Sequence, residues 1–220
     1  MVKTSPEAKG RTRNRRGEGG LLRDEIVAAA ERILEREGAE DAITLRSVAR
    51  EANIAAPSIY SHFADRDAII DAVLDIGYER LRMLIVDVTA AEPDPVARLL
   101  AGARAYAEFA MTDPARYRVL FGRSRAPEAP GLSGPPLETI EGLPDVWQRR
   151  LDAFRTLVDA IAACAAAGRS DSTDPFSDAT LLWTSMHGAV LMRQFVPRFP
   201  WPPLDSAVAE LAHRIGRIRD

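Results

Sequence analysis

The sequence predicts an all-α protein of about nine helices. Apolar residues recur at spacings of three and four along most of the chain, and no stretch alternates as a β-strand would. Gly, Pro, Asn, Asp and Thr stand where those periodic stretches begin and end. With 220 residues, 46% hydrophobic and 28% charged, the composition is that of a globular protein of one or two domains.

Residues 1–19 form a basic segment that we expect to be a flexible arm. They combine Pro, Gly, Lys and Arg with almost no apolar side chains, so they cannot bury enough surface to order themselves. The first 23 residues carry seven Lys or Arg against two Glu, although the whole chain has a net charge of -3. This asymmetry favours an anionic partner for the arm.

The first four expected helices are separated by recognisable start and stop residues. Gly38 ends the first helix, and Thr44 is a candidate N-cap for the second. Asn53 tolerates the left-handed backbone of a tight turn, Pro57 fits the first turn of a short third helix, and Asp65 caps a long fourth helix. The expected ranges are 21–37, 45–52, 56–62 and about 66–88.

The remaining helices follow a break at "AAEPDP". A stretch rich in Pro and Gly, 123–143, should be a loop. The last helix carries apolar residues at steps of four, three, four and three up to Ile218, the spacing of a packed seam. The expected ranges are 96–111, 115–121, 145–167, 176–195 and 204–218.

Two short helices joined by the turn at Asn53 are typical of a helix-turn-helix. The second helix of this motif enters the major groove of DNA. A helix of seven residues is roughly 10 Å long, close to the groove width of about 12 Å. We expect Ile59 and Phe63 to face inward. The residues that would then face outward are Pro57, Ser58, Tyr60 and His62.

The stretch from Ile43 to Val73 resembles the DNA-binding region of the tetracycline-repressor family of bacterial transcription regulators. The residues that carry the resemblance are Thr44, Val48-Ala49, Ala52-Asn53, Ile54-Ala55, Tyr60-x-x-Phe63 and Arg66-x-x-Ile69. Asn53 replaces the usual Gly, Ala55 the usual Ser, and Arg66 the usual Lys. Arg66 keeps the positive charge and adds the bidentate geometry that suits a phosphate.

The resemblance implies a homodimeric regulator, most often a repressor, that binds a palindromic operator and is released by a small molecule. It implies an arm (1–19), a DNA-binding domain (20–80, with the motif at 44–63) and a regulatory and dimerisation domain (81–220). The stretch "LLWTSMHGAVLMR" also resembles a subgroup whose C-terminal domain carries a Trp-x-x-x-His-Gly signature, here Trp183, His187 and Gly188.

Candidate DNA contacts come from the arm, the start of the second helix and the short third helix. A helix N-terminus is a ready anion site, and basic N-terminal arms reach phosphates or the minor groove. Ala55 stands in this region without the hydroxyl that the family has there. The candidates are Arg13, Arg15, Arg16, Thr44, Arg46, Ala55, Pro57, Ser58, Tyr60, His62 and Arg66.

Aromatic and Met residues of the C-terminal half are candidates for an effector pocket, although for each of them alone a place in the core is the stronger reading. Arg104 and Arg150 could pair with an anionic effector. The pocket candidates are Tyr106, Phe109, Tyr117, Phe121, Trp147, Phe154, Trp183 and Met186.

A dimer interface is expected on the last two helices. His187 and Gly188 favour structural packing more than a metal site, and Gly188 would permit close helix approach across a dimer. The interface candidates are His187, Gly188, Leu191, Leu204, Val208, Leu211 and Ile215.

Several other classes of protein are disfavoured. Cys164 is the only cysteine, which excludes an intrachain disulfide, and no apolar run approaches the roughly 18 residues of a membrane span, so we expect a cytoplasmic protein. No metal or other cofactor is expected, because the three His residues lack ligand spacing. An all-α enzyme would need a nucleophile–base pair or a phosphate loop, and a helical adaptor would leave the arm and the short helix unexplained.

Overall fold

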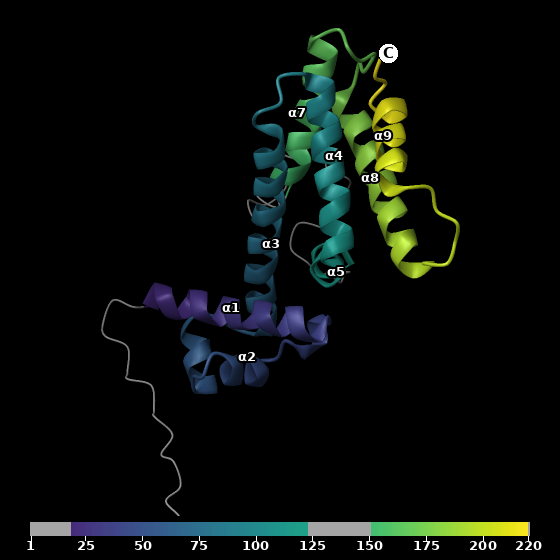
Figure 1. Cartoon of the computed structure of the whole chain (residues 1–220). Coiled ribbons are helices and arrows are strands. Elements are labelled where there is room, and N and C mark those ends of the chain that lie inside the picture. The colour runs from purple at the N-terminus through teal and green to yellow at the C-terminus, as the bar shows by residue number, and fades with distance from the viewer. Residues whose placement is uncertain (1–18, 123–150, 220) are drawn as a thin grey trace, which may run out of the picture. The chain divides into compact units, whose positions relative to one another are not determined.

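The structure, a computed structural model, describes residues 19–122 and 151–219 (Figure 1). The chain divides into two compact units, Met1–Val73 and Leu74–Asp220. Within the described ranges every regular element is a helix, and the one β-type pairing is an isolated antiparallel bridge between Ser170 and Ile218. The expected all-α class is confirmed. No described helix has the length and apolar character needed to span a bilayer.

The helices fall close to their expected ranges. Two expected stretches, the loop at 123–143 and the helix start at 145–150, lie outside the described residues. The described segments are α1 (Gly19–Glu37), η1 (Glu40–Ala42), α2 (Leu45–Glu51), η2 (Ala56–Ser61), α3 (Arg66–Thr89), α4 (Pro95–Thr112), α5 (Pro114–Gly122), α7 (Asp152–Ala166), α8 (Pro175–Phe195) and α9 (Leu204–Ile215).

The first unit follows its local sequence signals. Gly38 adopts φ +67° and its N–H bonds to the carbonyl of Leu34 at 2.8 Å, which closes α1. Asn53 adopts φ +53° in the turn after α2, as expected for a residue that tolerates the left-handed region. Asp65 accepts a bond from the N–H of Ala68 at 2.8 Å and so caps α3.

The third helix differs from its expected form. Residues Ala56–Ser61 form a 3₁₀ helix rather than an α-helix, with Pro57 in its first turn. The tighter winding is common in runs this short, because few hydrogen bonds are available to hold them. Packing holds the segment instead: Ile59 is fully buried and Phe63 is 4% exposed, both facing inward as expected.

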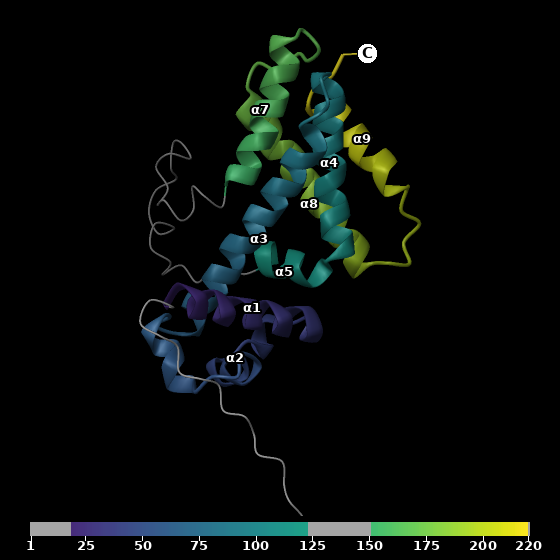
Figure 2. The ribbon, with the colours of Figure 1, turned by 60° about the vertical axis from the view of Figure 1, so that its left-hand side comes forward.

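The second unit has α4 at its centre. It packs against α9, α7 and α8, and α4 and α9 run side by side in both views (Figures 1 and 2). Fully or nearly fully buried residues of these helices, such as Leu99, Ile161, Leu182 and Val208, form one continuous core. The core therefore joins segments that are far apart in the sequence.

One sequence expectation for the second unit is wrong. The last helix ends at Ile215 and not at Ile218, because Arg217 adopts φ +51° and Ile218 instead pairs with Ser170. Near the end of α3 the apolar side chains of Leu84 and Val88 are exposed, at 37% and 43%.

Candidate nucleic-acid interface and ligand cavity

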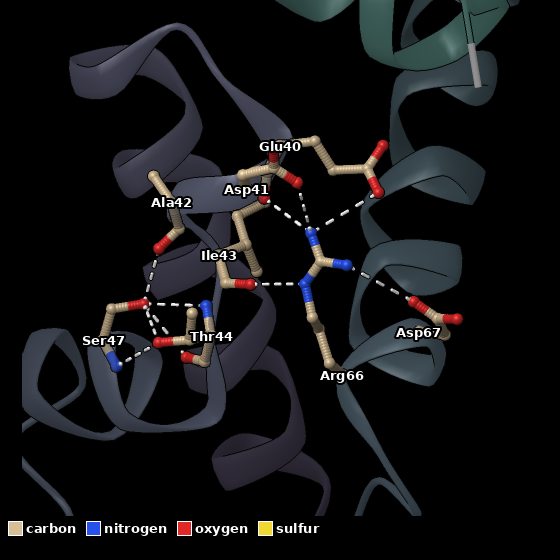
Figure 3. A network of polar contacts seen from close by, with 8 residues as sticks. All are labelled: Glu40, Asp41, Ala42, Ile43, Thr44, Ser47, Arg66 and Asp67. Carbon is tan, nitrogen blue, oxygen red and sulfur yellow. Dashed lines mark hydrogen bonds and ion pairs between the residues drawn. The ribbon is translucent and has the colours of Figure 1, made fainter.

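The start of α2 is held by a reciprocal pair of side-chain caps (Figure 3). Thr44 Oγ1 accepts from the Ser47 N–H at 3.0 Å, and Ser47 Oγ accepts from the Thr44 N–H at 2.8 Å. Ser47 Oγ also donates to the carbonyl of Ala42 at 2.7 Å. These contacts fix the N-terminus of α2 on η1 and confirm Thr44 as its N-cap.

Arg66 is engaged with the protein's own backbone. Its Nε donates to the carbonyl of Ile43 at 2.7 Å and its Nη2 to the carbonyl of Glu40 at 3.0 Å. Carboxylates of Glu40, Asp41 and Asp67 lie 3.6 to 3.7 Å from the guanidinium nitrogens (Figure 3). Nε and Nη2 are thus engaged within the chain, and Arg66 ties the start of α3 to the residues before α2. The expected DNA contact of Arg66 stays a prediction.

The segment η2 presents an exposed surface beside its buried anchors. Tyr60 is 61% exposed and Pro57 is exposed, whereas Ser58 and His62 are half-buried. Ala55, also exposed, is the N-cap residue of η2 and provides no side-chain hydrogen bond, as its replacement of Ser predicts. Pro57 and Tyr60 are therefore the accessible side chains of the expected recognition segment.

Two arginines add a basic face to α2. Arg46 and Arg50 are both exposed, and they share one helix face because they lie four residues apart. Neither guanidinium has a hydrogen-bond or ion-pair partner among the described residues. Our sequence reasoning included Arg46 but missed Arg50, although the four-residue spacing was available as a signal. The arm candidates Arg13, Arg15 and Arg16 lie outside the described residues.

The neighbouring carboxylate on α2 is already paired. Glu51 accepts from Arg32 at 2.9 Å and from Arg36 at 3.1 Å, both on α1. The hydrogen bond from Arg32, with that from Arg36, lowers the pKa of Glu51. Because α1 neutralises Glu51, the charge of Arg46 and Arg50 is not offset by this carboxylate.

Three buried polar groups meet in the second unit. Tyr117 Oη lies 2.5 Å from His187 Nδ1, and Tyr106 Oη lies 2.8 Å from Tyr117 Oη and 3.1 Å from the same nitrogen. Burial raises the pKa of both tyrosines and lowers that of His187. The two hydroxyls and the imidazole Nδ1 thus form one hydrogen-bonded group inside the aromatic core.

A cavity of about 480 Å³ lies within the second unit and is lined from α3, α4, α5, α7 and α8. Five of the expected pocket residues line it. Phe109 and Tyr117 are absent from the described lining, and Trp147 and Arg150 lie outside the described residues. Arg104 is exposed, and the arginine in the lining is Arg98, which sequence reasoning missed. The five lining residues are Tyr106, Phe121, Phe154, Trp183 and Met186.

Most expected dimer residues instead pack inside the chain. His187 bonds to the buried tyrosines, and Val208 is 1% exposed. The others that pack against the core are Leu191, Leu204, Leu211 and Ile215. The seam of α9 thus packs within one chain, and its expected role in a dimer stays a prediction.

Gly188 belongs to a different face of α8. No atom lies within 4 Å of where its Cβ would be, and the residue is half-buried. Along the same face run exposed residues at steps of three, four, four and three, with Phe195 71% exposed. The stripe, called here the α8 stripe, consists of Leu181, Thr184, Gly188, Met192 and Phe195.

Comparison with known proteins identifies the family. The model of the tetR family of bacterial regulatory proteins matches residues 26–73, which include the capped helix α2, η2 and the start of α3. The model of the tetracyclin repressor-like C-terminal domain matches residues 99–215. The chain belongs to the tetracycline-repressor family. This is a family of transcription regulators and not of enzymes.

Individual relatives agree with this assignment. The HTH-type transcriptional regulator Rv1816 of Mycobacterium tuberculosis is 31% identical over 169 residues, which are 74% of this chain and 66% of that protein. A protein of unknown function from Rhodococcus sp. RHA1 superposes with a TM-score of 0.72 at 26% identity, covering 93% of this chain and 98% of that one. AibR, solved with isovaleryl coenzyme A and operator DNA, shares the fold at a TM-score of 0.57 and 16% identity, with 90% and 99% covered.

Proposed function

We propose that this tetracycline-repressor family member is a homodimeric DNA-binding repressor that a small molecule releases from a palindromic operator. The observation that carries the proposal is the surface of the first unit: Arg46 and Arg50 are exposed without partners among the described residues, and Tyr60 is exposed on a segment anchored by buried Ile59. Cations and a phenol on a rigid support suit phosphate contacts. Because bacterial DNA lies in the cytoplasm, the protein acts there.

The contacts we assign to DNA fall into two classes. Arg46, Arg50 and Tyr60 bind phosphates, together with the arm, and the N-terminus of α2 at Thr44 adds its dipole. Residues of η2 reach the base edges, where Pro57 meets a thymine methyl group. Those base contacts come from Pro57, Ser58 and His62.

A test of this proposal measures binding to DNA from upstream of the gene by fluorescence anisotropy at several salt concentrations. Each phosphate contact contributes about 0.9 to the slope of log K against log salt concentration. We expect Arg46→Ala and Arg50→Ala each to weaken binding and flatten that slope, and deletion of residues 1–17 to do so more strongly. Arg198→Ala, an exposed arginine of the second unit, is the matched control and should leave both unchanged. Absence of binding to any palindromic site at physiological salt, with or without ligand, would refute the proposal.

Dimerisation through the α8 stripe completes the proposed regulator. An exposed apolar face of this length is unusual on a monomer, and Gly188 at its centre leaves room for a second helix to approach. Two such copies would hold their recognition segments about 34–36 Å apart, one turn of DNA. We expect Met192→Glu to shift the protein toward monomer in sedimentation velocity. Met83→Glu, which charges a methionine of similar exposure on α3, should leave the dimer intact. Equal sedimentation of the two variants would exclude this face.

Release would act through α3. This helix contributes residues 66–73 to the first unit and lines the cavity of the second unit from Leu74 to Thr89. A ligand that prefers one position of α3 shifts the population between DNA-binding and non-binding dimers. The fold neighbour AibR, solved with both a ligand and operator DNA, supports such a pairing of sites. We also assign the chain to the subgroup with the Trp-x-x-x-His-Gly signature, because Trp183 lines the cavity and His187 holds its tyrosines.

A further inference from the structure

The cavity of the second unit extends along much of α3. Its lining includes Leu74, Leu81 and Thr89 of that helix. At 1.5 Å per residue, the fifteen steps from Leu74 to Thr89 span about 22 Å. With a volume of about 480 Å³, the cavity therefore suits an elongated ligand better than a compact one.

The hydroxyl groups of the described cavity walls are already hydrogen-bonded within the chain. Tyr78 Oη donates to the carbonyl of Leu120 at 2.5 Å, and Tyr106 Oη is bonded to Tyr117 and His187. The hydroxyl of Thr89 donates to the carbonyl of Ile85 at 2.8 Å. The hydroxyl of Thr156 donates to the carbonyl of Ala153, one turn earlier in α7. Since the chain itself satisfies these hydroxyls, a polar ligand body would lose its own hydrogen bonds to water without replacement. The body of the ligand must be apolar.

One end of the lining differs, because it contains Arg98. The guanidinium is held by two bonds to a single acceptor, the carbonyl of Glu92, at 3.0 Å from Nε and 2.6 Å from Nη2. Its Nη1 donates to no atom of the described residues, and no carboxylate there lies within ion-pair distance of it. Asp94, which is nearby in sequence, caps α4 and pairs with Arg169 at 3.5 Å. Arg98 is therefore a positioned cation with donors to spare.

Among the described lining residues, Asp159 is the other charged one. It is exposed, so water solvates its carboxylate and screens it from a neighbouring anion. It forms no ion pair with Arg98. Because Arg98 is half-buried and its position is fixed by the Glu92 carbonyl, Arg98 should dominate the recognition of a head group.

We propose that the effector is an elongated apolar molecule with a carboxylate head, and that Arg98 is the residue that selects the head. This inference rests on the proposed function, in which a small molecule releases the DNA. The apolar chain runs along α3 toward the rings of Phe121, Phe154 and Trp183. Gly102 keeps the passage open between head and chain. A Cβ at this position would lie 3.4 Å from Ile85 Cγ2 and 3.6 Å from Thr89 Cγ2, so a larger side chain would fill the space between α3 and α4.

Three probes with the same chain and different heads test the proposal: decanoate, decan-1-ol and decyltrimethylammonium. The two ions are used below their critical micelle concentrations, and the alcohol below its solubility limit. Binding to the full chain is measured by titration calorimetry, with no DNA present. We expect decanoate to bind at least about tenfold more tightly than the alcohol, since a charged hydrogen bond is worth that much, and the ammonium to bind most weakly. Equal affinity of decanoate and decan-1-ol, or no binding of any probe, would overturn the proposal.

Variants assign the effect to Arg98. Arg98→Gln should reduce decanoate affinity to that of the alcohol and leave the alcohol unchanged, whereas Arg98→Lys should retain the preference for decanoate. Asp159→Asn should strengthen decanoate binding by a few-fold or less, and Gly102→Leu should weaken all three probes. A preference for decanoate that survives in Arg98→Gln would contradict the assignment. Release of DNA by decanoate is measured separately, so that a failure of the regulator proposal is distinguishable from a failure of this one.

Discussion

Within each of the two units, polar contacts join residues at different separations in the sequence. In the first unit the caps of α2 are local and join Thr44 to Ser47, three residues apart, and the longest-range polar contact described above, from Arg66 to the Glu40 carbonyl, spans 26 residues. In the second unit Tyr117 meets His187 across 70 residues, and the cavity is lined from five helices. The DNA-binding surface therefore rests on turn and cap chemistry, whereas the ligand cavity depends on the packing of the whole unit.

The largest effect is expected from two matched core substitutions, one in each unit. Ile59 and Ile161 are both fully buried, the first under η2 and the second in α7. Ile→Ala at such sites costs about 2–5 kcal/mol. We expect Ile59→Ala to abolish DNA binding while leaving ligand binding intact, and Ile161→Ala to weaken ligand binding first.

The sequence allows each unit to be followed separately. All three tryptophans lie beyond residue 73, so their fluorescence in urea reports on the second unit, while hydrogen exchange of peptides from 45–61 reports on the first. Protein concentration is held constant, because a dimer's stability depends on it. If Ile59→Ala lowers the fluorescence midpoint as much as Ile161→Ala does, the two units are not independent and the comparison fails.

The second prediction concerns pH and belongs to the second unit alone. Burial lowers the pKa of His187, so the unfolded chain binds a proton at a higher pH than the folded one. The stability that neutral His187 contributes to the folded state is therefore complete above the unfolded pKa of about 6.5 and is lost as pH falls below it. The free energy of unfolding cannot change through this residue by more than about 1.4 kcal/mol per pH unit. Urea titrations of wild type and His187→Gln between pH 7.5 and about 5 should show a steeper loss in the wild type; parallel curves would exclude His187.

This difference in range also explains what could be predicted from the sequence. Thr44, Asn53 and Asp65 were predictable because each acts on backbone groups at most three residues away. The inward positions Ile59 and Phe63 followed from helical spacing. The 3₁₀ form of η2 did not, because six residues are too few for periodicity to distinguish the two kinds of helix.

What the sequence did not predict depends on distant partners. The bonds of Arg66 to the carbonyls of Glu40 and Ile43 were not predicted, because they join residues 26 and 23 positions apart. Arg98 lines the cavity only because α3, α4 and α7 come together there. The apolar spacing of α9 marks a packed helix, but it gives no indication that the partner is α4 and α8 of the same chain.

A third prediction tests how far local caps support the DNA-binding surface. Loss of the Thr44 hydroxyl leaves the Ser47 N–H without its acceptor, and such changes typically cost about 1 kcal/mol. We expect Thr44→Ala to raise the exchange rate of α2 amides several-fold and Thr44→Ser to leave it near the wild-type value. The urea midpoint of the tryptophan signal should not move in either variant. A shift there would show that the cap also stabilises the second unit.

The smallest effect is expected from substitutions at the positive-φ turn residues, one in each unit. They test whether the same backbone conformation sets the same stability cost in both units. Asn53 in the first unit has φ +53°, and Gly168 in the second has φ +70° with no atom within 4 Å of where its Cβ would be. Gly and Asn both tolerate this region, so Asn53→Gly and Gly168→Asn should each change stability by no more than about 0.5 kcal/mol. Alanine lacks that tolerance, and Asn53→Ala and Gly168→Ala should each cost about 1 kcal/mol. Hydrogen exchange for the first site and urea denaturation for the second measure these costs. Similar costs at both sites would show that the units share their turn rules and differ only in the range of the contacts that build their sites.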